Sequence, residues 1–360
     1  MRTEYIDAVS PGRWESIVRE SKQAYFFHTP AWARILEEAY GYRNATRLYE
    51  VDGSDVLIPM MEKERYGLIT YYSMPEGYGN VFSPSGVSQE TLQTIITTIV
   101  GGRNLLLMLF LPPCSRFKFL EDTSVQRIEL RENRAHIIPL EEGVDAVRKR
   151  FNRNTRRSIA RAGKERVEVV PTNRKSDFDT FYSLYAQRSQ EWNLSETPYP
   201  RRFFESLYAH GSPHARLRLA ERDGEAIGGI ITLEYGTNVY YLASASPRAC
   251  RAYCANHLLL QDAIESACMH GYRFFDLGCS TLNPGLARFK EGFGAEEIPL
   301  ERYGVFSGLE RLYRGLGRAF RVVLDEGNRR YSVRHQSATP GAPLQAEREP
   351  QPDQSFMPGP

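Results

Sequence analysis

Lys290 is the residue whose type and setting point most directly to chemistry. It follows Phe289, precedes a Gly292-Phe293-Gly294 turn, and is one of only seven lysines in the 360 residues. A lysine ammonium can stabilise an oxyanion, donate a proton to a leaving oxygen or bind a phosphate. A solvated lysine on a helix surface is the alternative interpretation. The scarcity of lysine in this chain favours a functional role.

Asp276 lies at the end of an apolar segment and also has two interpretations. Its carboxylate could accept the proton of an amine, or it could cap the following turn through an Asx hydrogen bond. The cap is the favoured interpretation. Two histidines lack a visible partner, so we expect His28 to order the start of a helix and His257 to pack within a longer one. The sequence therefore identifies no general base.

A basic segment interrupts an otherwise balanced chain. Nine positively charged residues lie between Arg148 and Arg166 against one acid, Glu165, although the net charge is only +2. On a helix, Arg153, Arg157 and Arg161 form one stripe. Because such charges repel one another without an anion, the segment predicts contact with RNA phosphates or with an acidic or phosphorylated acceptor. A solvated linker is the alternative.

Three tyrosines, Tyr72, Tyr78 and Tyr303, lie in expected loops or at strand ends. The first two belong to the glycine-rich segment 71–80, whose composition suits the lining of a site for a polar acceptor. A bulged hairpin explains the same residues equally well, so both interpretations stay open.

The composition is that of a soluble globular protein, with 41% apolar and 25% charged residues. The longest apolar run, 105–111, is far shorter than the ~20 residues of a membrane span, and Glu4 and Asp7 lie where a signal peptide would be basic. We therefore expect a cytoplasmic protein. Cys250 and Cys254 lack the second ligand pair of a metal site, so we expect no metal.

The hydrophobic periodicity predicts two similar mixed α/β halves. In the first half, Thr29 is a candidate N-cap and Pro30 the first residue of a helix that ends at Tyr40, before Gly41. In the second half, tight turns predict a three-strand meander, followed by a long helix and by further strands, over residues 215–244, 254–270, 273–277 and 297–303.

The length and this repetition predict two domains with mixed sheets. We expect an N-terminal domain over 1–145, a basic connecting helix over 146–166, a C-terminal domain over 167–330 and a disordered tail over 331–360.

Three groups of motifs carry a family resemblance. They are His28-Thr29-Pro30-Ala31-Trp32, the central Arg153-x2-Arg156-Arg157-x3-Arg161, and Phe275-Asp276-Leu277-Gly278 followed by Phe289-Lys290-x2-Phe293-Gly294-Ala295. Together they resemble the FemAB-like peptidyl transferases, including their polysaccharide-associated relatives, over about residues 10–305. The Phe-Lys element after the Phe-Asp-Leu-Gly strand is the specific part. The resemblance implies an α/β fold of tandem GNAT-like acyltransferase domains.

Members of this family transfer an amino acid from aminoacyl-tRNA to an amine, in the best-known cases on a peptidoglycan precursor. The resemblance implies that Phe289 and Lys290 hold the aminoacyl ester and the tRNA acceptor end. Lys290 and Asp276 are then the catalytic candidates, and no cofactor or DNA partner is expected. The substrate-binding candidates are Phe289, Arg153, Arg157, Arg161, Tyr72, Tyr78 and Tyr303. A lipid-linked substrate would bring the protein into peripheral contact with a membrane surface.

The donor is the point on which alternatives remain. GNAT enzymes that use acetyl-CoA bind its pyrophosphate at a glycine-rich connection, whereas the corresponding segment 246–255 contains no glycine. Side chains there crowd a pyrophosphate, although Arg248 and Arg251 could bind a phosphate directly as cofactor-binding residues. The favoured function is transfer of an aminoacyl or acyl group to an amine of a cell-wall or exopolysaccharide precursor. An acyl-CoA-dependent N-acetyltransferase and a non-catalytic RNA- or glycolipid-binding protein are the alternatives.

Overall fold

A computed structural model describes residues 3–6, 9–65, 67–86, 88–100, 104–113, 125–127, 134–192, 194, 196–280 and 284–306. The tail expected over 331–360 lies outside these residues. The helices are α1 (Pro11–Arg19), α2 (Pro30–Tyr40), α3 (Gln89–Ile99), α4 (Val144–Arg150), α5 (Arg153–Lys164), α6 (Lys175–Glu191), α7 (Arg201–His210), α8 (Ala255–Met269) and α9 (Pro284–Glu291), with the 3-10 helices η1 (Phe26–His28) and η2 (Arg248–Tyr253).

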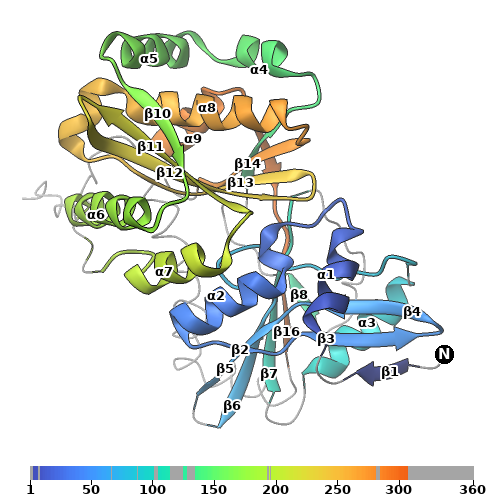
Figure 1. Ribbon diagram of the computed structural model, residues 1–360. Helices are drawn as coiled ribbons and strands as arrows, with labels where there is room; N and C mark the ends of the chain where they lie inside the picture. Colours follow the sequence, from blue (N-terminus) through green and yellow to red (C-terminus); the bar gives the residue numbers. More distant parts are fainter. Residues whose placement is uncertain are drawn as a thin grey trace, which may run out of the picture.

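The described strands form three sheets (Figure 1). The smallest has the order β1 (Thr3–Ile6), β3 (Arg47–Val51), β4 (Ser54–Ile58). The six-stranded sheet has the order β2 (Arg43–Asn44), β5 (Met61–Arg65), β6 (Leu68–Tyr72), β7 (Asn104–Phe110), β16 (Arg302–Phe306), β8 (Val125–Arg127). The seven-stranded sheet has the order β10 (Glu168–Thr172), β11 (Ala215–Arg222), β12 (Glu225–Tyr235), β13 (Asn238–Ala245), β14 (Phe274–Cys279), β9 (Arg134–Pro139), β15 (Glu296–Pro299).

The two larger sheets repeat one local plan. In the first, β6 is followed by α3 and by β7, which pairs with β6 in parallel. In the second, β13 is followed by η2, α8 and β14, which pairs with β13 in parallel. A parallel neighbour requires a crossover connection, and the helix supplies it. The repetition agrees with the two similar halves that the sequence predicts.

Each larger sheet also takes one strand from the far side of the expected boundary at residue 145. Strand β9 pairs antiparallel with β14, and β16 pairs antiparallel with β7. The single strand expected over 297–303 is therefore wrong, because β15 and β16 belong to different sheets. The division into domains stays a prediction, but β9 and β16 each belong to a sheet whose other strands lie mainly on the other side of residue 145.

The basic segment differs from the one connecting helix that we expect. It forms two helices, α4 and α5, because the chain turns at Phe151 and Asn152 caps the second helix by accepting from the Thr155 amide at 2.8 Å. Since the helices join β9 to β10, both ends lie in the seven-stranded sheet. In Figure 1, α4 and α5 lie outside α8, α6 covers the opposite face of that sheet, and α7 packs between α6 and α2.

The hydrophobic core joins the two halves. One buried cluster contains side chains of α1, η1 and α2 together with side chains of α6, α7 and the meander β11–β13. A second cluster lies under α8, and a third lies under α3. Burial of this shared apolar surface holds the halves in one arrangement.

Local signals are accurate where they depend on a few adjacent residues. Thr29 caps α2 by accepting from the Trp32 amide at 3.2 Å, and Pro30 is the first residue of the helix. Gly41 ends the helix in the left-handed conformation, at φ 66°. None of the described helices has both the length and the apolar character of a membrane span.

Candidate active site

Lys290 is buried where α9 crosses the carboxyl end of β14. Only 1% of the side chain is exposed, and its Nζ donates to the carbonyl oxygens of Gly278 at 3.0 Å and Cys279 at 2.6 Å. Burial without a directly bonded carboxylate lowers the pKa of Lys290 to about 7. Near neutral pH the amino group can therefore exist in either protonation state.

Asp276 is the second buried ionisable group at this strand end. Its Oδ1 accepts from the Gly278 amide at 2.7 Å, so the predicted Asx cap is confirmed. Its Oδ2 accepts from the Tyr25 hydroxyl at 3.2 Å, and the Tyr78 hydroxyl also stabilises the charged form. Burial outweighs these bonds and raises the pKa of Asp276 to about 6.

An aromatic cluster of Tyr25, Phe27, Tyr78 and Tyr240 surrounds this carboxylate. The ring centroids of Tyr25 and Tyr78 are 5.3 Å apart, and those of Phe27 and Tyr240 are 4.7 Å apart. The four rings come from η1 and the N-cap residue before it, from the loop after β6 and from β13, so both halves contribute. Burial, with the nearby Asp276, raises the pKa of Tyr240 well above 10. The cluster thus seals the junction from water.

The segment 71–80 packs tightly against this cluster. Tyr78 is 1% exposed, and a Cβ atom on Gly77 would lie 2.3 Å from the Phe27 ring. A Cβ on Gly79 would lie 1.9 Å from the Ser73 hydroxyl. The glycines are needed for this close approach, and the segment faces the core instead of an open groove.

The other two candidate tyrosines lie elsewhere. Tyr72 is half-buried, with its ring 5.8 Å from that of Tyr42. Tyr303 is 1% exposed in the core under α3, and its hydroxyl bonds to Glu301. The three tyrosines that the sequence groups together therefore do not form one surface, and their substrate-binding role stays a prediction.

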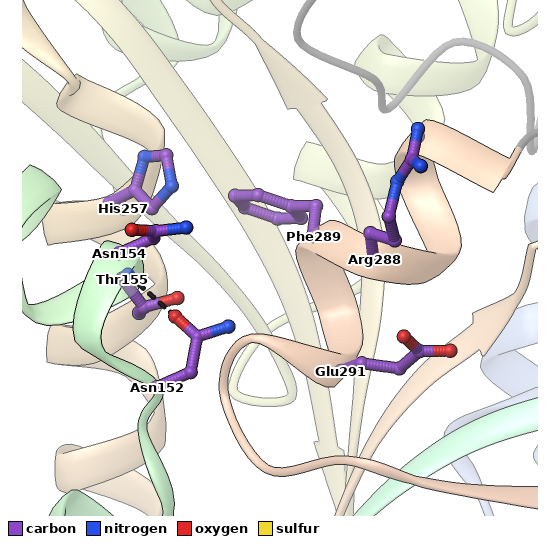
Figure 2. A pocket seen from close by; sticks show the side chains of 8 residues that line it. Asn152, Asn154, Thr155, His257, Arg288, Phe289 and Glu291 are labelled. Carbon is purple, nitrogen blue, oxygen red and sulfur yellow. Dashed lines mark hydrogen bonds between the residues drawn. The ribbon is translucent and has the colours of Figure 1, made fainter.

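Phe289 lies on a different face of α9 from Lys290. It lines a pocket of about 400 Å³ between α5, α8 and α9, which we call the α5–α9 pocket. Its ring centroid is 5.0 Å from that of His257, and Figure 2 shows it pointing toward His257 and Asn154. The pocket is lined by Asn152, Asn154, Thr155, His257, Gly285, Arg288, Phe289 and Glu291.

The two histidines are held in the neutral form. His28 accepts from the Tyr25 amide at 2.9 Å and so orders the start of η1 near α2, and burial lowers its pKa to about 3. Burial lowers the pKa of His257 to about 4. His257 packs against aromatic rings as expected, but the sequence did not predict that it lines a pocket.

The remaining candidates are arginines at two separate places. Arg153, Arg157 and Arg161 are exposed on α5. Arg248 and Arg251 lie on η2, where the Arg248 amide donates to both carboxylate oxygens of Glu191 at 2.9 and 3.0 Å. Arg188 donates to the same carboxylate at 2.6 Å. Burial together with Arg188 and Arg248 lowers the pKa of Arg251.

Sequence reasoning missed several residues of these sites. Tyr25, Tyr240, Glu191 and Arg188 carry no local motif, and only the packing of distant elements brings them to the site. For the pocket, the one local signal was the pair Asn152 and Asn154 within the basic segment.

Comparison with known proteins agrees with the repeated sheet plan. Residues 146–291 match the family model described as an acetyltransferase (GNAT) domain. The structure of FemX superposes with a TM-score of 0.72 at 14% identity, covering 87% of this chain and 99% of that one. The protein is a tandem GNAT-fold protein that resembles FemX.

Two further similarities place this fold among related proteins. A UDP-N-acetylmuramoylpentapeptide-lysine N(6)-alanyltransferase of Weissella viridescens is 25% identical over 154 residues. That match spans 42% of this chain and 45% of the relative. The chain therefore spans less than half of the length of this relative. A tandem GNAT protein from the clavulanic acid biosynthesis pathway superposes with a TM-score of 0.51 at 11% identity, covering 84% of this chain and 98% of that one.

Proposed function

We propose that the protein is a FemX-like N-acyltransferase whose reaction centre lies at the carboxyl end of β14. The observation that carries this proposal is the buried Lys290 amino group, held by the carbonyl oxygens of Gly278 and Cys279. Burying an amino group without a directly bonded carboxylate is costly, and such groups concentrate at functional sites. The same feature disfavours a non-catalytic binding protein.

The chemistry assigns different tasks to the two buried groups. The acceptor amine attacks the carbonyl carbon of the donor, an amide bond forms, and the bond to the leaving oxygen breaks. The amine loses one proton and the leaving oxygen gains one. Lys290 suits the second transfer and the stabilisation of the oxyanion, because both of its forms are available at its pKa of about 7. Since Lys290 is 1% exposed, donor binding must uncover its amino group.

Asp276 is proposed to position this strand end. Both of its oxygens already accept hydrogen bonds, from the Gly278 amide and from the Tyr25 hydroxyl. The bond to Gly278 fixes the turn whose carbonyl oxygen accepts a hydrogen bond from Lys290. Asp276 would therefore act on the reaction through Lys290.

For the substrates, we propose an aminoacyl ester of tRNA as donor and an amine of a peptidoglycan precursor as acceptor. The match to the Weissella viridescens enzyme, named as an alanyltransferase of UDP-N-acetylmuramoylpentapeptide-lysine, supports the acceptor. The donor is what the resemblance to the FemAB-like transferases implies. An exopolysaccharide precursor is the other acceptor that the sequence suggests.

Acyl-CoA is a weaker donor candidate. Glu191 already accepts hydrogen bonds from the Arg248 backbone amide and the Arg188 guanidinium, so a carboxylate takes donors that a pyrophosphate would need. Micromolar binding of acetyl-CoA in calorimetry would overturn this preference and assign Arg248 and Arg251 to phosphate binding.

The test is single-turnover transfer of alanine from alanyl-tRNA to UDP-N-acetylmuramoylpentapeptide. Lys290→Met keeps the apolar stem of the side chain and removes its amine, and it should lower the rate by about 10²–10³-fold. Lys175→Met, at an exposed lysine of α6, is the matched control. Circular dichroism establishes that both variants are folded. A folded Lys290→Met protein with an unchanged rate would remove Lys290 from the mechanism.

A further inference from the structure

His136 of β9 is a buried histidine at the strand end that holds Lys290. It is 1% exposed, and its Nδ1 lies 3.1 Å from the hydroxyl oxygen of Ser280. The other ring nitrogen, Nε2, is buried and has no hydrogen-bond partner within the described part of the chain. A buried polar atom that lacks a partner is costly. The position of Nε2 therefore favours a partner that arrives with a substrate.

The hydrogen bond with Ser280 indicates which ring nitrogen is basic. A serine hydroxyl both donates and accepts, so either tautomer of His136 can form this bond. With the proton on Nδ1, the ring donates to Ser280 and Nε2 keeps a free lone pair. With the proton on Nε2, a buried N–H would have no acceptor, which is rarer in proteins than a bare acceptor. The favoured tautomer thus presents Nε2 as a base.

Two consecutive residues at the end of β14 bind Lys290 and His136. The Cys279 carbonyl oxygen accepts from Lys290 Nζ at 2.6 Å, and the next residue, Ser280, bonds to His136. Cys279 is also paired with Ala135, the residue before His136 in β9. An amino group and an imidazole are therefore attached to adjacent positions of one strand end.

Strand alternation places His136 on the side of the sheet where α9 packs. Ala135 and Ile137 belong to the cluster that joins the halves, whereas Ile138 belongs to the cluster under α8. Because neighbouring side chains of a strand point to opposite faces, His136 shares the face of Ile138. Helix α9 contributes Phe289 to that cluster and packs against β9.

Among the described residues, Lys290 and Glu297 are the charged groups that act on His136. Burial lowers the pKa of His136, the charge of Lys290 lowers it further and Glu297 raises it, with a result of about 4. Glu297 lies directly opposite His136 in β15 and pairs with Arg134 at 2.7 Å. The imidazole is therefore neutral at pH 7 and can accept a proton.

The ionisable side chains of β14 face the other side of the sheet. Asp276 bonds to the Tyr25 hydroxyl, and Cys279 packs in the cluster that joins the halves. Of the charged neighbours, Lys290 thus has the largest effect on the pKa of His136.

A paired transfer of protons would keep the buried charge constant. In the resting protein Lys290 can carry the charge while His136 is neutral. If Lys290 gives up a proton as His136 takes one, the site still holds one positive charge, and no second charge is buried. Loss of the Lys290 charge also removes one cause that lowers the pKa of His136. The two groups are thus suited to act in one reaction.

We propose that His136 is the general base of the transfer reaction and that Ser280 positions its ring. As the acceptor nitrogen bonds to the donor carbonyl carbon, its proton passes to Nε2 of His136. The bond to the leaving oxygen then breaks, and that oxygen takes a proton from Lys290. Return of the proton from His136 to Lys290 restores both groups. The inference rests on the proposed function for the reaction, and substrate binding must uncover Nε2 together with the Lys290 amino group.

The experiment is single-turnover transfer from alanyl-tRNA to UDP-N-acetylmuramoylpentapeptide, measured from pH 6 to pH 8.5. His136→Asn keeps an amide that can donate to Ser280 but lacks the Nε2 base. The rate at pH 7 should fall by about 10²-fold or more. The loss should shrink by about tenfold per pH unit, because hydroxide then accepts the proton. A loss by the same factor at every pH would indicate a structural role and overturn the proposal.

His270→Asn is the matched control. His270 is exposed at the end of α8, and its Nδ1 also lies near a serine, 3.5 Å from the Ser266 hydroxyl. This variant should transfer at the unmodified rate, and a loss equal to that of His136→Asn would contradict the assignment.

Two variants of Ser280 test the positioning role. Ser280→Ala should lower the rate by about 3–10-fold through loss of one hydrogen bond, and Ser280→Thr, which keeps the hydroxyl, should restore most of it. An unchanged rate in Ser280→Ala would remove Ser280 from the proposal.

Nitrogen NMR of protein labelled in its histidines tests the arrangement without turnover. The signal of His136 is identified by its loss in His136→Asn, or in His136→Gln if the first variant does not fold. At pH 7 the ring should be neutral with its proton on Nδ1, and Lys290→Met should raise the pKa of His136 by removing the neighbouring charge. A proton on Nε2, or the same pKa in both proteins, would overturn the proposal.

The outcomes separate this proposal from the proposed function. Transfer by the unmodified protein, with an unchanged rate in folded His136→Asn, would refute the general base alone. Absence of transfer by the unmodified protein would refute the proposed function and the role of His136 in it, but not the coupling of His136 to Lys290 that NMR measures.

Discussion

Replacing Asp276 with Asn should remove a pH-dependent cost to stability. Folding raises the pKa of this carboxyl from 3.8 to about 6, chiefly through burial. Between these values the folded protein holds a proton that the unfolded chain has lost, so stability falls as the pH rises. At about 1.36 kcal/mol per pKa unit, the contribution of Asp276 to the free energy of unfolding should fall by about 3 kcal/mol over the whole titration, of which about 2.4 kcal/mol falls between pH 4 and pH 7.

The Asp276→Asn variant is expected to fold because an amide oxygen can still accept from the Gly278 amide. The Tyr25 hydroxyl can then accept from the new amide group. Urea unfolding, followed by the fluorescence of the buried Trp14 and Trp32, gives the free energy at each pH. The prediction concerns the difference in the free energy of unfolding between the unmodified protein and the Asp276→Asn variant at each pH.

Lys290 titrates close to this range, so the comparison needs a control. Its pKa of about 7 lies below the usual 10.5, and its own contribution therefore raises stability as the pH rises above about 7. Repeating the comparison in a Lys290→Met background removes that titration. If the difference between protein and Asp276→Asn variant stays constant from pH 4 to pH 7 in both backgrounds, the burial argument for Asp276 is refuted.

The remaining predictions concern packing and capping, and urea unfolding measures each of them. Tyr25→Phe removes a donor to Asp276 and should cost about 1.5–3 kcal/mol at pH 8 but less at pH 4, where the carboxyl is neutral; an equal loss at both pH values would contradict this. Gly79→Ala should cost about 1–3 kcal/mol, since its Cβ would lie 2.4 Å from a backbone oxygen. Gly12→Ala, with nothing within 4 Å, should be neutral or stabilising. Thr29→Ala should cost about 1 kcal/mol through loss of the helix cap, and an unchanged midpoint would show that the cap is dispensable.

The sequence by itself determined features that depend on neighbouring residues. The cap at Thr29, the left-handed end at Gly41 and the Asx bond of Asp276 each follow from side chains and backbone within a few positions. The repeated order of meander, helix and strand follows from hydrophobic periodicity in the same way. The motif around Phe289 and Lys290 likewise indicates the region of the proposed site.

Only the tertiary structure decided which distant residues meet. Strands β9 and β16 each pair in the sheet of the other half, which depends on segments far apart in the chain. Lys290 and Phe289 contact different distant elements, because they lie on different faces of α9. The burial of Lys290 and the rings of Tyr25, Phe27, Tyr78 and Tyr240 around Asp276 arise because two halves share one core. Local propensity contains no information about such contacts, since their free energy comes from surface that is buried only when the whole chain has folded.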